Sequence, residues 1–210
     1  SVVLANRQSY RTNEGLSQVQ ESARTAFELL ARDIREAGAT GCDNTGRVAN
    51  VLKPAANLWW QNRKGGQAYD EEKKDPAPPF GTAPAERVRG TDSIQLRGIE
   101  GTGVAITGHE PTSANFKLNA ATTTIADNDV LMACDFDHAA IFQVTNYNGE
   151  LTVVHSTGAN AGVPPGNCSK GLGYPTDCDD TNANGNVYEF PPNAQLAPYA
   201  PGLDWNPYLT

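Results

Sequence analysis

The residues of this chain best suited to catalysis stand together in the segment Asp135-Phe136-Asp137-His138. In a β-strand, residues two apart point to the same face. Asp135 and Asp137 would then meet and could hold a metal ion or share a proton. Aspartate is also common where a strand ends in a turn. The sequence favours the turn, and a hydrolase that uses Asp135 and Asp137 is the alternative.

Other catalytic motifs are missing from the sequence. His109-Glu110 lacks the second histidine of a zinc-protease helix, and neither a G-x-S-x-G elbow nor a phosphate-binding loop occurs. The three histidines stand far apart along the chain. We therefore expect no catalytic residues, no enzymatic activity and no cofactor.

One loop matches half of a calcium-binding motif. Asp180, Asn182 and Asn184 precede Gly185 as the early ligands of an EF-hand-type loop do. The bidentate glutamate of such a loop is absent, because Pro191 occupies its position. The sequence favours a plain turn rich in Asn and Gly, with calcium as the alternative.

Two adjacent tryptophans, Trp59 and Trp60, are the other candidate for ligand binding. Indole rings on a surface can stack on sugars, but a buried pair is the favoured role. Together with the calcium candidate, this pair leaves open a secreted β-rich module that binds calcium or carbohydrate.

The charge is unevenly distributed along the 210 residues, whose net charge is -8. Residues 1–124 carry 15 basic and 14 acidic side chains, whereas residues 125–210 carry ten acidic side chains and one basic side chain, Lys170. An acidic surface repels phosphate backbones, so we expect no nucleic-acid partner.

The four cysteines indicate disulfides formed in an oxidising compartment. They form no C-x-x-C pair, and no histidine lies at zinc-finger spacing from them. Four cysteines allow three pairings. The short separation of Cys168 and Cys178 favours a bond between them, which leaves Cys42 to pair with Cys134.

A long helix is the strongest structural signal. Apolar residues recur every three or four positions, which predicts an amphipathic helix over residues 4–37 that Gly38 and Gly41 end. Residues 1–5 have no capping chemistry and are typical of an apolar helix that continues upstream. We expect one stripe of this helix to pack on the sheet of the same chain; it consists of Leu16, Val19, Ala23, Phe27, Leu30 and Ile34.

The rest of the chain has the pattern of short strands joined by polar loops. Residues 61–90 are expected to form a long surface loop. After Pro191 the sequence is rich in proline and shows no regular pattern. In the 139–156 segment, Asn148-Gly149 predicts a hairpin turn. The expected strands are residues 48–52, 93–99, 104–107, 114–118, 129–136, 139–146, 151–156 and 187–190.

These elements predict one domain of the α+β class. Residues 1–38 would form the long helix, and residues 39–210 a β-rich head with an antiparallel sheet and long loops.

The helix and its flank also carry a family resemblance. The run RTNEGLSQVQESARTAFELLARDIREAG (residues 11–38), followed by Gly41-Cys42, resembles the PilW family of type IV minor pilins. The segments 129–135, 140–145 and 187–190 are similar to strands of the same family.

The resemblance implies a pilin fold and a structural role. Minor pilins of this family are similar to the J-type pseudopilins of type II secretion systems, and they pack with other minor pilins and the major pilin to prime pilus assembly. A tip adhesin is a further implied partner, with roles in cell adhesion and twitching motility. A native pilin is anchored in the inner membrane by an apolar N-terminal helical half, so this chain would be the periplasmic fragment of a protein that later reaches the pilus tip. The family usually extends further beyond residues 187–190.

Overall fold

The computed structural model describes residues 2–38, 47–53, 65–75, 78–84, 86–99, 103–158, 162–176, 178 and 185–201. These residues form one N-terminal helix and a large mixed sheet of ten strands. The chain divides into two units, residues 1–37 and residues 38–210. The predicted α+β class therefore describes the structure.

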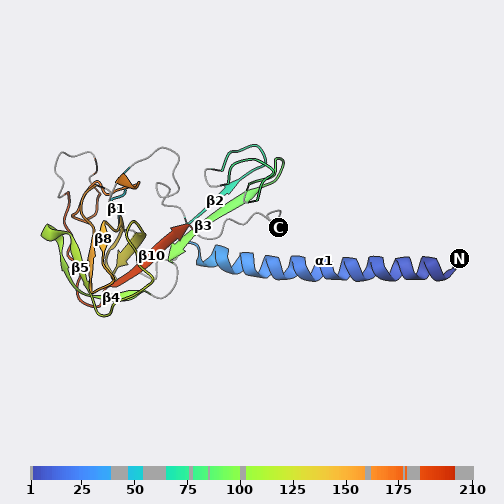
Figure 1. Ribbon diagram of the computed structural model, residues 1–210, viewed down its shortest axis with the longest axis horizontal. Helices are drawn as coiled ribbons and strands as arrows, with labels where there is room; N and C mark the ends of the chain where they lie inside the picture. Colours follow the sequence, from blue (N-terminus) through green and yellow to red (C-terminus); the bar gives the residue numbers. More distant parts are fainter. Residues whose placement is uncertain are drawn as a thin grey trace. The chain divides into compact units, whose positions relative to one another are not determined.

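Helix α1 (Val2–Glu36) is continuous and has nearly the bounds that the periodicity predicts (Figure 1). Arg24 and Glu28, one turn apart, form an ion pair of 3.1 Å on its surface. Beyond the helix, Gly38 has a φ of +77°, a left-handed conformation that glycine adopts without a steric penalty. A glycine in this conformation is the usual way to end a helix, as the sequence predicts.

The apolar stripe of α1 is largely exposed in the structure. Phe27 is 72% exposed, Ala23 is exposed and Leu30 is half-buried; Leu16, Val19 and Ile34 are also exposed. The packing of this stripe on the sheet of the same chain stays a prediction, and burial of the stripe between subunits is its alternative. None of the described helices has the length and apolar character that crossing a bilayer requires.

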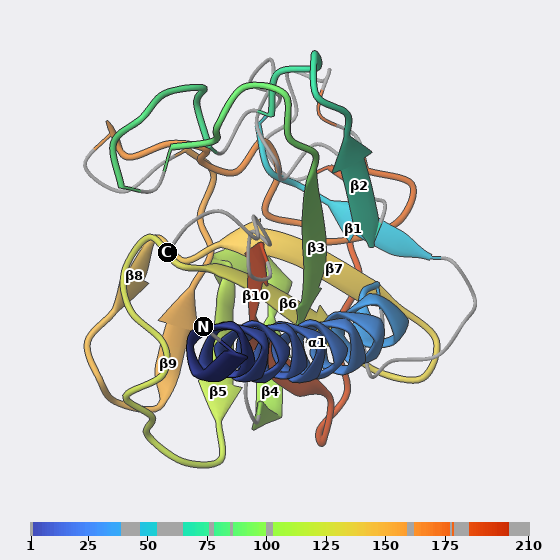
Figure 2. The ribbon, with the colours of Figure 1, turned by 90° about the vertical axis from the view of Figure 1, so that its right-hand side faces the viewer.

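The sheet has the strand order β1-β7-β6-β10-β4-β5-β9-β8, and β3 joins it beside β10 and carries β2 on its other side (Figure 2). The pair β1–β7 is parallel and the others are antiparallel, so the expected antiparallel sheet is in fact mixed. The strands are β1 (Val48–Asn50), β2 (Gly66–Tyr69), β3 (Ser93–Ile99), β4 (Val104–Glu110), β5 (Asn115–Leu118), β6 (Val130–Cys134), β7 (Ala139–Gln143), β8 (Asn146–Tyr147), β9 (Thr152–Val154) and β10 (Gln195–Pro201).

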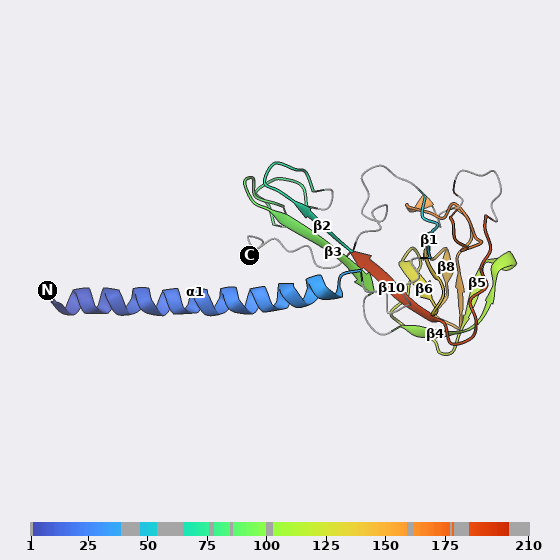
Figure 3. The ribbon, with the colours of Figure 1, turned by 180° about the vertical axis from the view of Figure 1, so that it is seen from behind.

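Strand β10 occupies the middle of the sheet, although the proline-rich sequence after Pro191 shows no strand pattern (Figure 3). Along one edge it pairs with β6 over four residues. Along the other edge, Gln195 and Leu196 pair with β4, and the residues from Tyr199 onward pair with β3. Pro198 lies between these two pairings, where the edge changes its partner and the missing N–H of proline is tolerated.

The central strands β6 and β7 are buried on both faces. Leu131 and Ala133 of β6 belong to one apolar cluster, whereas Met132 and Cys134 belong to a second cluster on the opposite face. Strands covered on both faces appear in the sequence as continuous apolar runs.

Three further segments differ from the sequence-based expectation. Residues 61–90, expected as a loop, contain β2, which pairs with β3 over its whole length. Residues 187–190 do not form the expected strand, because Val187 makes only an isolated bridge with Leu172. The turn at Asn148-Gly149 is confirmed, but it joins β8 to β9, whereas β7 pairs with β6.

Candidate functional site

The segment with the most enzyme-like residue types forms the turn between β6 and β7. The backbone N–H of Asp135 donates to the carbonyl oxygen of His138 at 3.0 Å and closes this turn. The side chain of Phe136, at its tip, is 77% exposed. The residues are therefore in a hairpin turn, as the favoured interpretation predicts.

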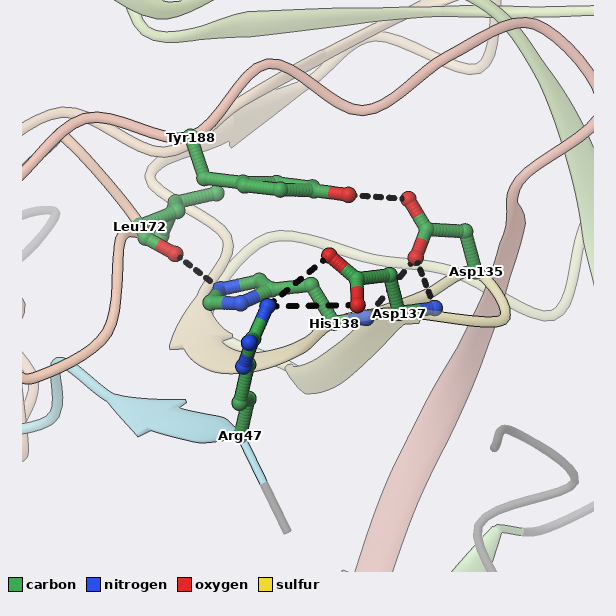
Figure 4. A network of polar contacts seen from close by, with 6 residues as sticks. All are labelled: Arg47, Asp135, Asp137, His138, Leu172 and Tyr188. Atoms are coloured by element: carbon green, nitrogen blue, oxygen red, sulfur yellow. Dashed lines mark hydrogen bonds and ion pairs between the residues drawn. The ribbon is translucent and has the colours of Figure 1, made fainter. Parts of the chain in front are cut away.

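The carboxylate of Asp135 is fully engaged in holding the turn (Figure 4). Its Oδ1 accepts hydrogen bonds from the backbone N–H groups of Asp137 and His138, both at 2.8 Å. Its Oδ2 accepts a hydrogen bond of 2.7 Å from the hydroxyl of Tyr188. Both oxygens thus stabilise the local backbone and the contact with Tyr188.

The ring of Tyr188 also stacks on His138, with centroids 4.1 Å apart. Nε2 of His138 donates to the carbonyl oxygen of Leu172 at 2.8 Å, because a carbonyl can only accept. Desolvation and then the hydrogen bond to Asp135 raise the pKa of Tyr188 above its ordinary value. The phenol therefore keeps its proton and remains a donor to Asp135.

Asp137 points to a different partner. Nη1 of Arg47 contacts its two carboxylate oxygens at 3.1 and 3.2 Å (Figure 4). The two aspartates therefore do not form a dyad: one is held by Tyr188 and backbone N–H groups, the other by an arginine. Within the described part of the chain, no group of three histidine, cysteine or acidic side chains is placed to hold a metal ion.

The sequence of the whole chain and its structure were also compared with known proteins. No family model, curated protein or solved structure matches this chain.

The cysteines form disulfides in the described residues. Cys168 is bonded to Cys178, as the short spacing predicts. Cys134 is also disulfide-bonded. Its expected partner, Cys42, lies outside the described residues, as do the calcium candidates Asp180, Asn182 and Asn184 and the tryptophans Trp59 and Trp60.

Arg87 is a structural centre that sequence reasoning missed. Its side chain is fully buried, and its guanidinium lies 4.8 Å from the ring centroid of Phe80. The guanidinium donates to four backbone carbonyls, those of Tyr69, Asp70, Lys73 and Thr91. It therefore holds the turn after β2 and the approach to β3 together. Nothing in the sequence distinguishes it from Arg89, which is exposed.

A second missed feature is a pair of buried histidines. His109 on β4 and His155, which follows β9, meet within the core. They are 46 residues apart in the sequence, and no local spacing signals their contact. Neither residue lies in the turn between β6 and β7. The ring of Phe190 contacts both His109 and His138, the last residue of that turn, with centroids 5.7 Å apart in each case.

Proposed function

We propose that this chain is the periplasmic domain of a PilW-like minor pilin. In this role it is a structural subunit of the complex that primes pilus assembly and remains at the pilus tip. It is held at the inner membrane before assembly and acts by packing against other minor pilins and the major pilin, without catalysing a reaction.

The exposed apolar stripe of α1 is the observation that carries this proposal. A 35-residue helix with exposed Leu16, Val19 and Phe27 presents apolar surface that water solvates poorly. Burial of one such side chain contributes about 1.5–3 kcal/mol. Assembly with other subunits provides that burial along the helix.

The head contributes a stable, cross-linked body to the assembly. The disulfide between Cys168 and Cys178 suits an oxidising compartment such as the periplasm. The hydrogen bonds of Asp135 hold a turn and bind each of its carboxylate oxygens to a partner in the same chain. Both features support a structural subunit over a hydrolase.

A matched pair of helix variants tests the proposal. Leu16 belongs to the stripe and Leu29 lies outside it, and both are exposed. In the bacterium that encodes the chain, Leu16→Asn should weaken capture of the other minor pilins by about 30-fold, which corresponds to the loss of about 2 kcal/mol of burial. Leu29→Asn should leave capture unchanged. Equal effects of the two substitutions would contradict a role of the stripe.

Deletion of the gene separates the pilin from its alternatives. Loss of surface pili, counted by electron microscopy, is the expected result. Normal pili with a block in protein secretion would instead identify a pseudopilin of a type II secretion system. Normal pili and normal secretion would reject both assembly roles and favour the secreted module that binds calcium or carbohydrate.

A further inference from the structure

Two histidines face each other inside the head. Nε2 of His109 and Nε2 of His155 are 3.1 Å apart, and the two side chains are 4% and 0% exposed. His109 stacks on Phe116 with centroids 4.1 Å apart, and Phe142 and Phe190 complete the aromatic surroundings. The pair therefore lies in an environment that solvates a positive charge poorly.

The hydrogen bonds determine where the protons of the neutral pair are. The backbone N–H of Phe190 donates to Nδ1 of His109 at 3.2 Å, so this nitrogen is unprotonated. A neutral imidazole has one proton, and His109 must carry it on Nε2. That proton is donated to Nε2 of His155, which in turn carries its own proton on Nδ1.

Any additional proton breaks a hydrogen bond in this arrangement. A proton on Nδ1 of His109 would face the N–H of Phe190, donor against donor. A proton on Nε2 of His155 would face the Nε2–H of His109 in the same way. Burial lowers the pKa of His109 to about 4, and burial followed by the charge of His109 lowers that of His155.

No described carboxylate forms an ion pair with either ring. The side chain of Lys117 donates to Thr152, and that of Lys170 to the carbonyl of Thr112 in the 3-10 turn η2 (Pro111–Ser113). The charged or titratable groups on the elements around the pair are Glu110 on β4, Lys117 on β5, Lys170 beside η2, His138 next to β7, and Tyr188 and Glu189 beside Phe190.

We propose that the His109–His155 pair is an acid-sensitive catch that holds the segment 185–190 in the core and releases it when the pair takes up protons. Phe190, the last residue of this segment, is buried, and its backbone N–H is hydrogen-bonded to His109. Further back, Tyr188 donates its N–H to Gly171 and its hydroxyl to Asp135. Release of Phe190 itself breaks the hydrogen bond from its N–H to His109 and uncovers the aromatic cluster. Release of the whole segment also breaks the hydrogen bonds of Tyr188 and the one that the N–H of Gly173 donates to the carbonyl of Asn186.

The direction of the pH effect follows from the lowered pKa values. Below the ordinary histidine pKa of 6.5, the released state binds protons that the closed state excludes. The closed state is therefore fully favoured above pH 6.5 and loses its advantage as the pH falls toward 4. The equilibrium constant for opening should rise about tenfold per pH unit for each histidine that takes up a proton.

Amide hydrogen exchange of the whole chain tests the catch. Exchange at Phe190, corrected for the intrinsic effect of pH, should show an opening constant that rises about 10- to 100-fold between pH 6 and pH 5. The amide of Val144, bonded to Asp129 in the neighbouring core, should show no such rise. Equal loss of protection at both amides would mean global unfolding and would overturn the proposal, as would constant protection at Phe190.

A variant pair assigns the effect to the histidines. His155→Gln keeps an acceptor for His109 and cannot take up a proton. In this variant the opening constant at Phe190 should therefore rise by tenfold or less for each pH unit of acidification. His138→Gln, outside the pair, should keep the full rise. The imidazole nitrogen signals in the NMR spectrum of the unmodified chain test the proton positions without any variant. At pH 7 they should show His109 protonated on Nε2 and His155 protonated on Nδ1. Any other pattern overturns the proposal.

Discussion

The side-chain amide of Asn167 pairs with both backbone groups of Gln143. Its Oδ1 accepts the N–H of Gln143 at 2.7 Å, and its Nδ2 donates to the carbonyl of Gln143, also at 2.7 Å. One side chain thus takes the place of a neighbouring strand at the end of β7. Both residues are fully buried, so these bonds satisfy backbone groups that water does not reach.

Replacement of this side chain should therefore destabilise the head. Asn167→Ala leaves the N–H and the carbonyl of Gln143 without these partners, and the free energy of unfolding should fall by about 3 kcal/mol. Asn167→Asp keeps the acceptor and loses the donor, so its effect on unfolding in urea should also be large. Asn186→Ala, at an exposed site, should change stability by about 0.5 kcal/mol or less. Equal effects at Asn167 and Asn186 would contradict the role of the amide.

Arg87→Lys should not preserve the turn after β2. A lysine ammonium has three donors without the planar fork of arginine and cannot reach the four carbonyls that Arg87 binds. We expect a loss of about 3 kcal/mol in unfolding experiments and earlier proteolysis between residues 65 and 91. Arg89→Lys is the control at an exposed neighbour. A stable Arg87→Lys variant would show that the carbonyls are satisfied in another way.

Tyr188→Phe removes the hydroxyl that donates to Asp135 and keeps the ring that stacks on His138. The free energy of unfolding at pH 7 should fall by about 1.5 kcal/mol, a typical value for a hydrogen bond to a charged group. Because folding raises the pKa of Tyr188, its contribution is complete below pH 10 and is lost as the pH rises further. Melting temperatures at pH 9 and pH 11 should therefore differ less in the variant than in the unmodified chain.

Phe27→Gln tests whether the head needs the helix stripe for its own stability. Because Phe27 is 72% exposed, the free energy of unfolding of the chain should change by about 0.5 kcal/mol or less. If the stripe packs on the sheet of the same chain, truncation of this ring would cost about 3–5 kcal/mol. Urea unfolding distinguishes the two results, and the larger loss would contradict the exposed position.

Local patterns in the sequence predict the elements whose stability is local. The spacing of Leu16, Val19 and Leu30 predicts α1, because apolar residues three and four apart share one face of any helix. The bond between Cys168 and Cys178 follows from their short separation, and the Asp135 turn follows from residue types that commonly end a strand.

Contacts between distant parts of the chain decide the features that local sequence patterns do not predict. Pro198 argues against a central strand in the sequence, and only the change of partner from β4 to β3 makes room for it in β10. The contacts of His109 with His155 and of Arg87 with the carbonyls of Tyr69 and Lys73 join residues far apart in the chain. The sequence by itself determined the helix, the turn and the close disulfide, because their interactions lie within a few residues. The tertiary structure decided the sheet order and the buried polar groups, because each of them depends on partners that only the folded chain brings together.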